Sequence, residues 1–141
     1  MKNSLIKTDQ EKKMEKLHWE SLKWKSQFLL MDDELLFINR LLNSYVFEPK
    51  TPNLFERLMD YKSRIKKTED NIDKIKSCLI IHESELGGVM ECLGKSCEKA
   101  YQMEHEVIEA EVMSCIEDFQ NLKLEIFNYA GGILRKNKPN N

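Results

Sequence analysis

The chain has 141 residues, of which 41% are hydrophobic and 33% charged, with five glycines, three prolines and a formal net charge of -2. This profile is typical of one domain of long helices and argues against a β-sandwich. The lack of a basic excess argues against a general nucleic-acid-binding protein.

Membrane insertion and secretion are not predicted either. No segment approaches the roughly 20 apolar residues that a helix needs to cross a bilayer. The lysines of the N-terminal segment are not followed by the apolar core of a signal peptide. We therefore expect a cytoplasmic protein with neither a membrane nor a nucleic acid as its partner.

The first predicted element is a helix over about residues 4–46. Apolar residues recur there alternately three and four positions apart, from Leu17 to Tyr45, and only Ser21 interrupts this stripe. Further apolar residues lie beside the stripe, so we expect the helix to be buried on more than one side, either as the central helix or as a homodimer face. These residues are Leu22, Leu29, Leu30, Leu36, Phe37 and Leu41.

A second helix is predicted over about residues 52–93. Thr51 and Pro52 suit its cap and first turn, and a thinner apolar stripe follows from Leu58 to Leu93. Charged residues flank this stripe, which indicates either a solvated face or a contact with a partner helix.

The end of the second helix has two alternatives, the pair Gly87-Gly88 and Gly94. Val89 and Leu93 continue the stripe in phase beyond the glycine pair. We therefore place the turn at Gly94.

A third helix is predicted over about residues 95–130, with a stripe from Tyr101 to Tyr129. The AGG sequence should end it, and residues 135–141 should form a frayed polar tail. The fold class is thus all-α: an elongated antiparallel three-helix bundle with coiled-coil-like heptad packing, in one domain over residues 1–134. Lysines predominate in residues 1–25 and acids in residues 82–118, so these stretches should attract each other.

Three histidines stand out against this pattern, because His82 and His105 occupy stripe positions that otherwise hold apolar residues. With turns near residues 49–50 and at Gly94, His18 would lie level with residue 81, and His82 would face about residue 106. The three histidines would then form one layer. Each has a carboxylate one helical turn away: Glu15 for His18, Glu85 for His82 and Glu109 for His105.

Two interpretations of this layer remain open. Imidazoles and carboxylates that project into a bundle core can hold Zn²⁺ or iron, with His18, His82, His105, Glu15, Glu85 and Glu109 as candidate ligands. Cys78, four residues before His82, would favour Zn²⁺. Alternatively, polar residues in a coiled-coil seam fix register and partner number through buried hydrogen bonds.

The EKLH sequence at residues 15–18 resembles the Glu-x-x-His motif of ferritin-like di-iron proteins. The resemblance covers four residues. Those proteins need a second such motif and four helices, whereas Gln102 precedes His105 and Leu79 precedes His82 at the required spacing. The chain is therefore not assigned to that family.

The cysteines are expected to be reduced thiols in the cytoplasm. Cys92 and Cys97 flank the predicted turn at Gly94, so they should lie close together. Reversible oxidation of this pair is the alternative.

The leading functional prediction is a protein that acts through contacts with itself, as a homodimer, or with another helical chain. The alternative is a metal-binding bundle that uses the histidine layer. Enzymatic activity is not predicted, because every candidate nucleophile lies within a helix and no turn exposes it.

Overall fold

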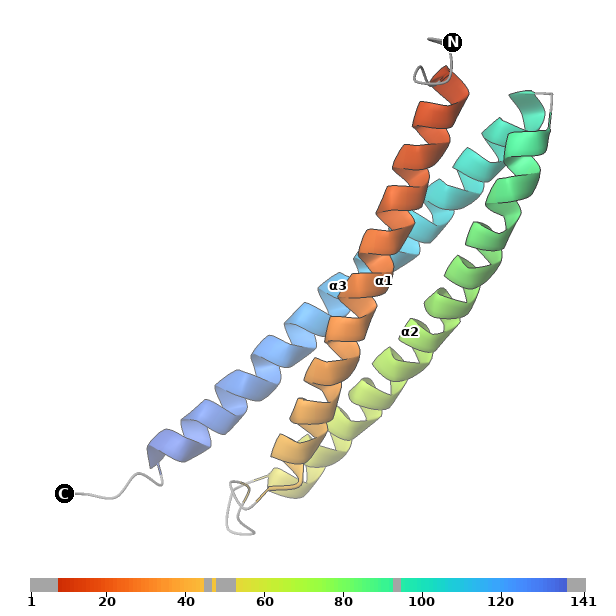
Figure 1. Cartoon of the computed structure of the whole chain (residues 1–141). Coiled ribbons are helices and arrows are strands. Elements are labelled where there is room, and N and C mark those ends of the chain that lie inside the picture. Colours follow the sequence, from red (N-terminus) through yellow and green to blue (C-terminus); the bar gives the residue numbers. More distant parts are fainter. Residues whose placement is uncertain (1–7, 45–46, 48–52, 93–94, 137–141) are drawn as a thin grey trace. The chain divides into compact units, whose positions relative to one another are not determined.

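The computed structural model describes residues 8–44, 47, 53–92 and 95–136. This part of the chain forms three helices and no strand (Figure 1): α1 (Asp9–Leu42), α2 (Leu54–Glu91) and α3 (Lys95–Lys136). The helices make the contacts of a three-helix bundle, which confirms the predicted all-α fold. Within the described ranges, no helix is long and apolar enough to cross a membrane.

The first helix is capped at its start and ends earlier than predicted. The amide of Glu11 donates a hydrogen bond to the Thr8 hydroxyl at 3.1 Å, which is the contact of an N-cap residue. At the other end, the side chains of Asn43 and Ser44 donate to backbone carbonyls within the preceding four residues. Such local bonds compete with helical ones, and α1 ends at Leu42 where the stripe predicted residue 46.

The second helix continues through Gly87 and Gly88 to Glu91, so the alternative end at this glycine pair is wrong. Val89 is buried, as its stripe position predicts. The start at Thr51-Pro52 and the stop at Gly94 lie outside the described residues.

The third helix extends to Lys136, beyond the predicted end near residue 130. It passes through Gly131 and Gly132 because the apolar stripe continues after them, where Ile133 is buried. Burial of the apolar stripe beyond the two glycines therefore outweighs their unfavourable helix propensity.

The three stripes form the core. All the stripe residues from Leu17 to Leu42 on α1, from Tyr61 to His82 on α2 and from Tyr101 to Ile126 on α3 are buried. Ser21 and Thr68 are buried with them, so the polar members keep their predicted positions.

The described residues divide into two compact units, one within Met1–Phe28 and Asp73–Met113, the other within Leu29–Ile72 and Ser114–Asn141. Each unit takes one segment from each helix. In the first unit, Lys13 pairs with Glu98 and Lys25 with Glu83. These two ion pairs link the basic stretch of the sequence to the acidic one, as predicted.

The second unit has an up-down-up arrangement. Asn39 donates to Glu69 and Lys62 to Asn43, so α1 and α2 are antiparallel. Lys123 pairs with Glu34, and the ring of Phe127 lies 6.2 Å from that of Phe37, so α1 and α3 are parallel.

The apolar residues beside the α1 stripe are not covered by the other helices. Leu22, Leu29, Leu30, Leu36 and Phe37 are all exposed, and Leu41 is half-buried. The prediction that α1 is central and buried on more than one side within the chain is therefore wrong. The alternative, that these residues form a contact face, stays a prediction.

Candidate functional site

A hydrogen-bonded pair of histidines lies in the core of the first unit. Nε2 of His82 is 2.9 Å from Nδ1 of His105, and both side chains are buried. On the outer side of the pair, Nδ1 of His82 donates to Glu104 at 2.8 Å and Nε2 of His105 donates to Glu20 at 2.9 Å. The four residues form a continuous polar chain through the bundle, called here the histidine relay.

Aromatic rings hold the relay in place. Tyr101 stacks on His82 with ring centroids 4.0 Å apart and an interplanar angle of 7°. Trp24 stacks on His105 with centroids 4.7 Å apart. Met14, Leu17 and Val89 pack with Tyr101 in one apolar cluster. The packed rings fix both imidazole orientations, so the relay nitrogens face defined partners.

Charge and burial act on the relay together. Burial lowers the pKa of His105 below its ordinary value, and the hydrogen bond to Glu20 opposes this only in part. Burial, reinforced by the negative charges of Glu83, Glu104 and Glu85, raises the pKa of Tyr101 to about 12. The Tyr101 phenol is therefore neutral at physiological pH and can donate a hydrogen bond.

One end of the relay carries a group of potential metal ligands. His82, Glu85 and Glu104 each offer one ligand atom, and these atoms all lie within 4.8 Å of one another. His82 is buried, Glu104 is intermediate and Glu85 is exposed, so the group opens to solvent on one side. Two of the six predicted ligands, His82 and Glu85, belong to this group.

The other four predicted ligands are not members of this group. His105 joins the relay through His82. Glu109 acts on His105 only through its charge. Neither His18 nor Glu15 belongs to the group, and Cys78 is a half-buried free thiol outside it. Hydrogen bonding therefore joins two of the three predicted histidines, and the place of His18 in the layer stays a prediction.

The register between α1 and α2 differs from the predicted one. Lys25 contacts Glu83, whereas the predicted register places it opposite Lys74. The antiparallel pairing of α1 and α2 is thus shifted by more than two helical turns. The α2–α3 register was predicted well, since His82 meets Glu104 and His105 where residue 106 was expected.

Sequence reasoning missed Glu20 and Glu104, because it sought carboxylates one turn away on the same helix. Both partners come from another helix. Glu104 directly precedes His105, so the α2–α3 register predicts its proximity to His82, but the contact of Glu20 depends on the α1 register.

A disulfide joins Cys92 to Cys97 in the first unit, with their Cα atoms 6.3 Å apart. Their predicted proximity is confirmed, and the prediction that all four cysteines are thiols is wrong for this pair. Cys78 and Cys115 are free.

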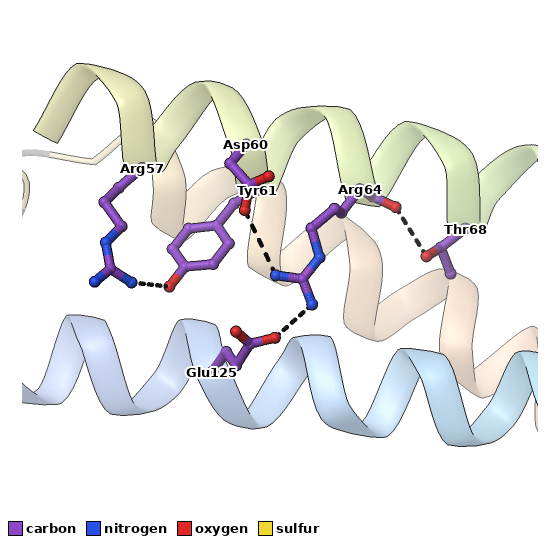
Figure 2. Close-up of polar contacts among 6 residues, drawn as sticks. All are labelled: Arg57, Asp60, Tyr61, Arg64, Thr68 and Glu125. Atoms are coloured by element: carbon purple, nitrogen blue, oxygen red, sulfur yellow. Dashed lines mark hydrogen bonds and ion pairs between the residues drawn. The ribbon is translucent and has the colours of Figure 1, made fainter. Parts of the chain in front are cut away.

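The second unit has a different polar feature, a network centred on Arg64 (Figure 2). Its guanidinium contacts Asp60 on α2 and Glu125 on α3, and its carbonyl accepts a hydrogen bond from Thr68. About two turns earlier on α2, Arg57 donates to Tyr61. These contacts satisfy the polar groups beside the core and link two helices.

The same unit carries an apolar surface on α1. Leu29, Leu30, Leu36 and Phe37 are between 51% and 63% exposed. Phe37 makes an edge contact with Phe127 of α3, which is also exposed. We call these five residues the apolar face.

Comparison with known proteins finds no matching family model, no matching curated protein and no matching solved structure. Functional inference therefore depends on the geometry of the relay and of the apolar face.

Proposed function

We propose that the protein acts through protein contacts, and that its apolar face associates with the apolar face of a second copy. The observation that carries the proposal is the exposure of Leu29, Leu30, Leu36 and Phe37 beside a core stripe that is already buried. Phe28, Met31, Leu35 and Ile38 fill the core positions of the same helix segment. The exposed residues are therefore surplus to the packing of the chain.

Burial of this face supplies a driving force for association. Complete burial of a Leu or Phe side chain is worth about 1.5–3 kcal/mol. Single exposed apolar residues are common, but a contiguous set on one helix is typical of an interaction surface. The Phe37–Phe127 contact extends the set from α1 to α3.

Charges beside the face suit a second copy. Asp33 and Arg40 are both exposed and lie three residues before Leu36 and three residues after Phe37. If two α1 helices pair antiparallel about the Leu36–Phe37 centre, each Asp33 lies opposite Arg40 of the second copy. An interface with this two-fold symmetry is self-complementary in charge as well as in apolar character.

Sedimentation velocity over a range of concentrations tests the proposal. The wild-type protein should show a concentration-dependent monomer–dimer equilibrium, which Phe37→Glu should weaken at least about tenfold, because it places a charge at the centre of the interface. Met59→Glu on α2, where Met59 is also exposed, is the matched control and should leave the equilibrium unchanged. A wild-type protein that stays monomeric at every concentration would contradict the proposal.

A further inference from the structure

The hydrogen bonds of the relay need more donors than two neutral imidazoles possess. The contacts of His82 with Glu104 and of His105 with Glu20 each use a ring N–H, because an ionised carboxylate only accepts. The third contact, between Nε2 of His82 and Nδ1 of His105, then brings two lone pairs together at 2.9 Å. A buried polar contact without a proton between its atoms is unfavourable.

A third proton, which makes one imidazole cationic, removes this conflict, and so does a metal cation on Nδ1 of His82. The proton of His82 then resides on Nε2 and is donated to Nδ1 of His105, while Nε2 of His105 still donates to Glu20. Every ring nitrogen has a partner in this arrangement, and both imidazoles are neutral. A metal-bound histidine that donates its second N–H to a chain ending in a carboxylate is the usual outer-shell pattern of protein metal sites.

The other ligands lie beside this nitrogen. Glu85 and Glu104 place carboxylate oxygens within 4.8 Å of a ring nitrogen of His82 and of each other, and the Glu104 oxygen is 2.8 Å from Nδ1. One imidazole and two carboxylates leave a fourth position open on a tetrahedral ion. The exposure of Glu85 provides a path of entry from solvent.

A second observation points to the same place. Tyr101 is only 3% exposed, stacks on His82, and its hydroxyl has no hydrogen-bond partner among the described residues. The charges of Glu83, Glu104 and Glu85 act on this hydroxyl, so two of the three carboxylates that it senses belong to the ligand group. The hydroxyls of Ser21 and Tyr129 also have no partner among the described residues. The Tyr101 hydroxyl differs from them because its ring stacks on His82, where a water held by the ion would supply a partner.

We propose that His82, Glu85 and Glu104 bind a divalent transition metal, with Zn²⁺ as the best match to the ligand set, and that His105 and Glu20 orient His82 from behind. This site lies in the first unit, whereas the apolar face lies in the second. The inference is therefore independent of the proposed self-association.

Calorimetric titration of the full-length, tag-free protein with Zn²⁺ tests the inference, with the Cys92–Cys97 disulfide kept oxidised so that its sulfurs do not compete for metal. One Zn²⁺ should bind per chain. Glu85→Gln should weaken binding at least about tenfold, since it removes a ligand at an exposed position where the fold does not depend on it. Glu106→Gln, also exposed and two residues from Glu104, is the matched control and should bind as wild type does.

The Glu20→Gln variant distinguishes binding at the proposed site, which includes His82, from binding to surface carboxylates alone. Glu20 does not belong to the ligand group, but it holds the far end of the relay, so its loss should weaken Zn²⁺ binding about tenfold or more. The absence of saturable Zn²⁺ binding by the wild-type protein would overturn the inference. So would wild-type affinity in Glu85→Gln, because the ion would then bind elsewhere.

Discussion

His82 and His105 meet through ring nitrogens 2.9 Å apart, at core positions where the neighbouring layers of α2 and α3 hold apolar side chains such as Leu79 and Ile108. A polar contact at such a position specifies which residues of the two helices face each other, because only one register pairs the two rings. The relay therefore has a structural consequence whether or not an ion is bound.

Replacement of one histidine should be more harmful than replacement of both. In His82→Leu, Nδ1 of His105 loses its partner and stays buried, so the free energy of unfolding should fall by about 1–3 kcal/mol. In the double variant His82→Leu/His105→Leu no unpaired nitrogen remains, and part of this loss should be recovered. Urea unfolding of the metal-free proteins measures both values, and a double variant no more stable than His82→Leu would contradict this explanation.

The disulfide should be detectable by thiol counting. The denatured, unreduced protein should contain two reactive thiols, those of Cys78 and Cys115, and four after reduction. Because Cys92 and Cys97 are five residues apart, the closed loop is short, and reduction should lower stability by only about 2 kcal/mol. Four reactive thiols before reduction would show that the pair is not joined.

The last turns of α3 should contribute to stability beyond Gly131 and Gly132. Ile133 is buried, so Ile133→Ala should lower the free energy of unfolding by about 2 kcal/mol. Leu134→Ala is the control, because Leu134 is 52% exposed and its truncation leaves no cavity. Equal stabilities of the two variants would mean that the stripe does not extend past the glycines.

The contact of Arg64 with Glu125 predicts a dependence of stability on pH. The hydrogen bond from Arg64 lowers the pKa of Glu125 below its ordinary value of 4.5. The folded state therefore favours the ionised form, so the stabilisation is present above pH 4.5 and is lost as the pH falls through the lower pKa of the folded state.

Comparison with Glu125→Gln isolates the contribution of the Arg64–Glu125 contact to stability. Both partners are partly exposed, so the difference in stability between wild type and variant should be no more than about 1 kcal/mol at neutral pH. It should vanish in acid. A difference that grows as the pH falls would contradict the assigned sign.

The sequence predicts the helices and their buried faces because both follow from a local period. The stripe residues between Leu17 and Leu42 are buried as expected, since each lies three or four residues from the next. The candidate site depends instead on the register between helices, which is set by turns that the period does not describe. Gly94 marks the predicted turn between the second and third helices, and the register predicted from it correctly brings His82 near His105. The connection between the first and second helices has no such marker, so the predicted register there was wrong and did not reveal the contact of Glu20 with His105.

The apolar face shows a second property that the sequence alone does not predict. Leu36 and Phe37 have the composition of core residues, and composition alone does not distinguish a second buried side from a surface that binds another chain. Their exposure in the structure excludes a second buried side within the chain, and experiment must test whether they bind another chain.

Cross-linking between copies tests self-association through the apolar face most directly. Leu36→Cys, in a protein whose free cysteines are replaced by Cys78→Ser and Cys115→Ser, places one thiol at the centre of the proposed interface. Mild oxidation at low protein concentration should yield a covalent dimer, whereas Met59→Cys in the same background should stay monomeric. Equal cross-linking at the two positions, or none at position 36, would contradict the proposed interface.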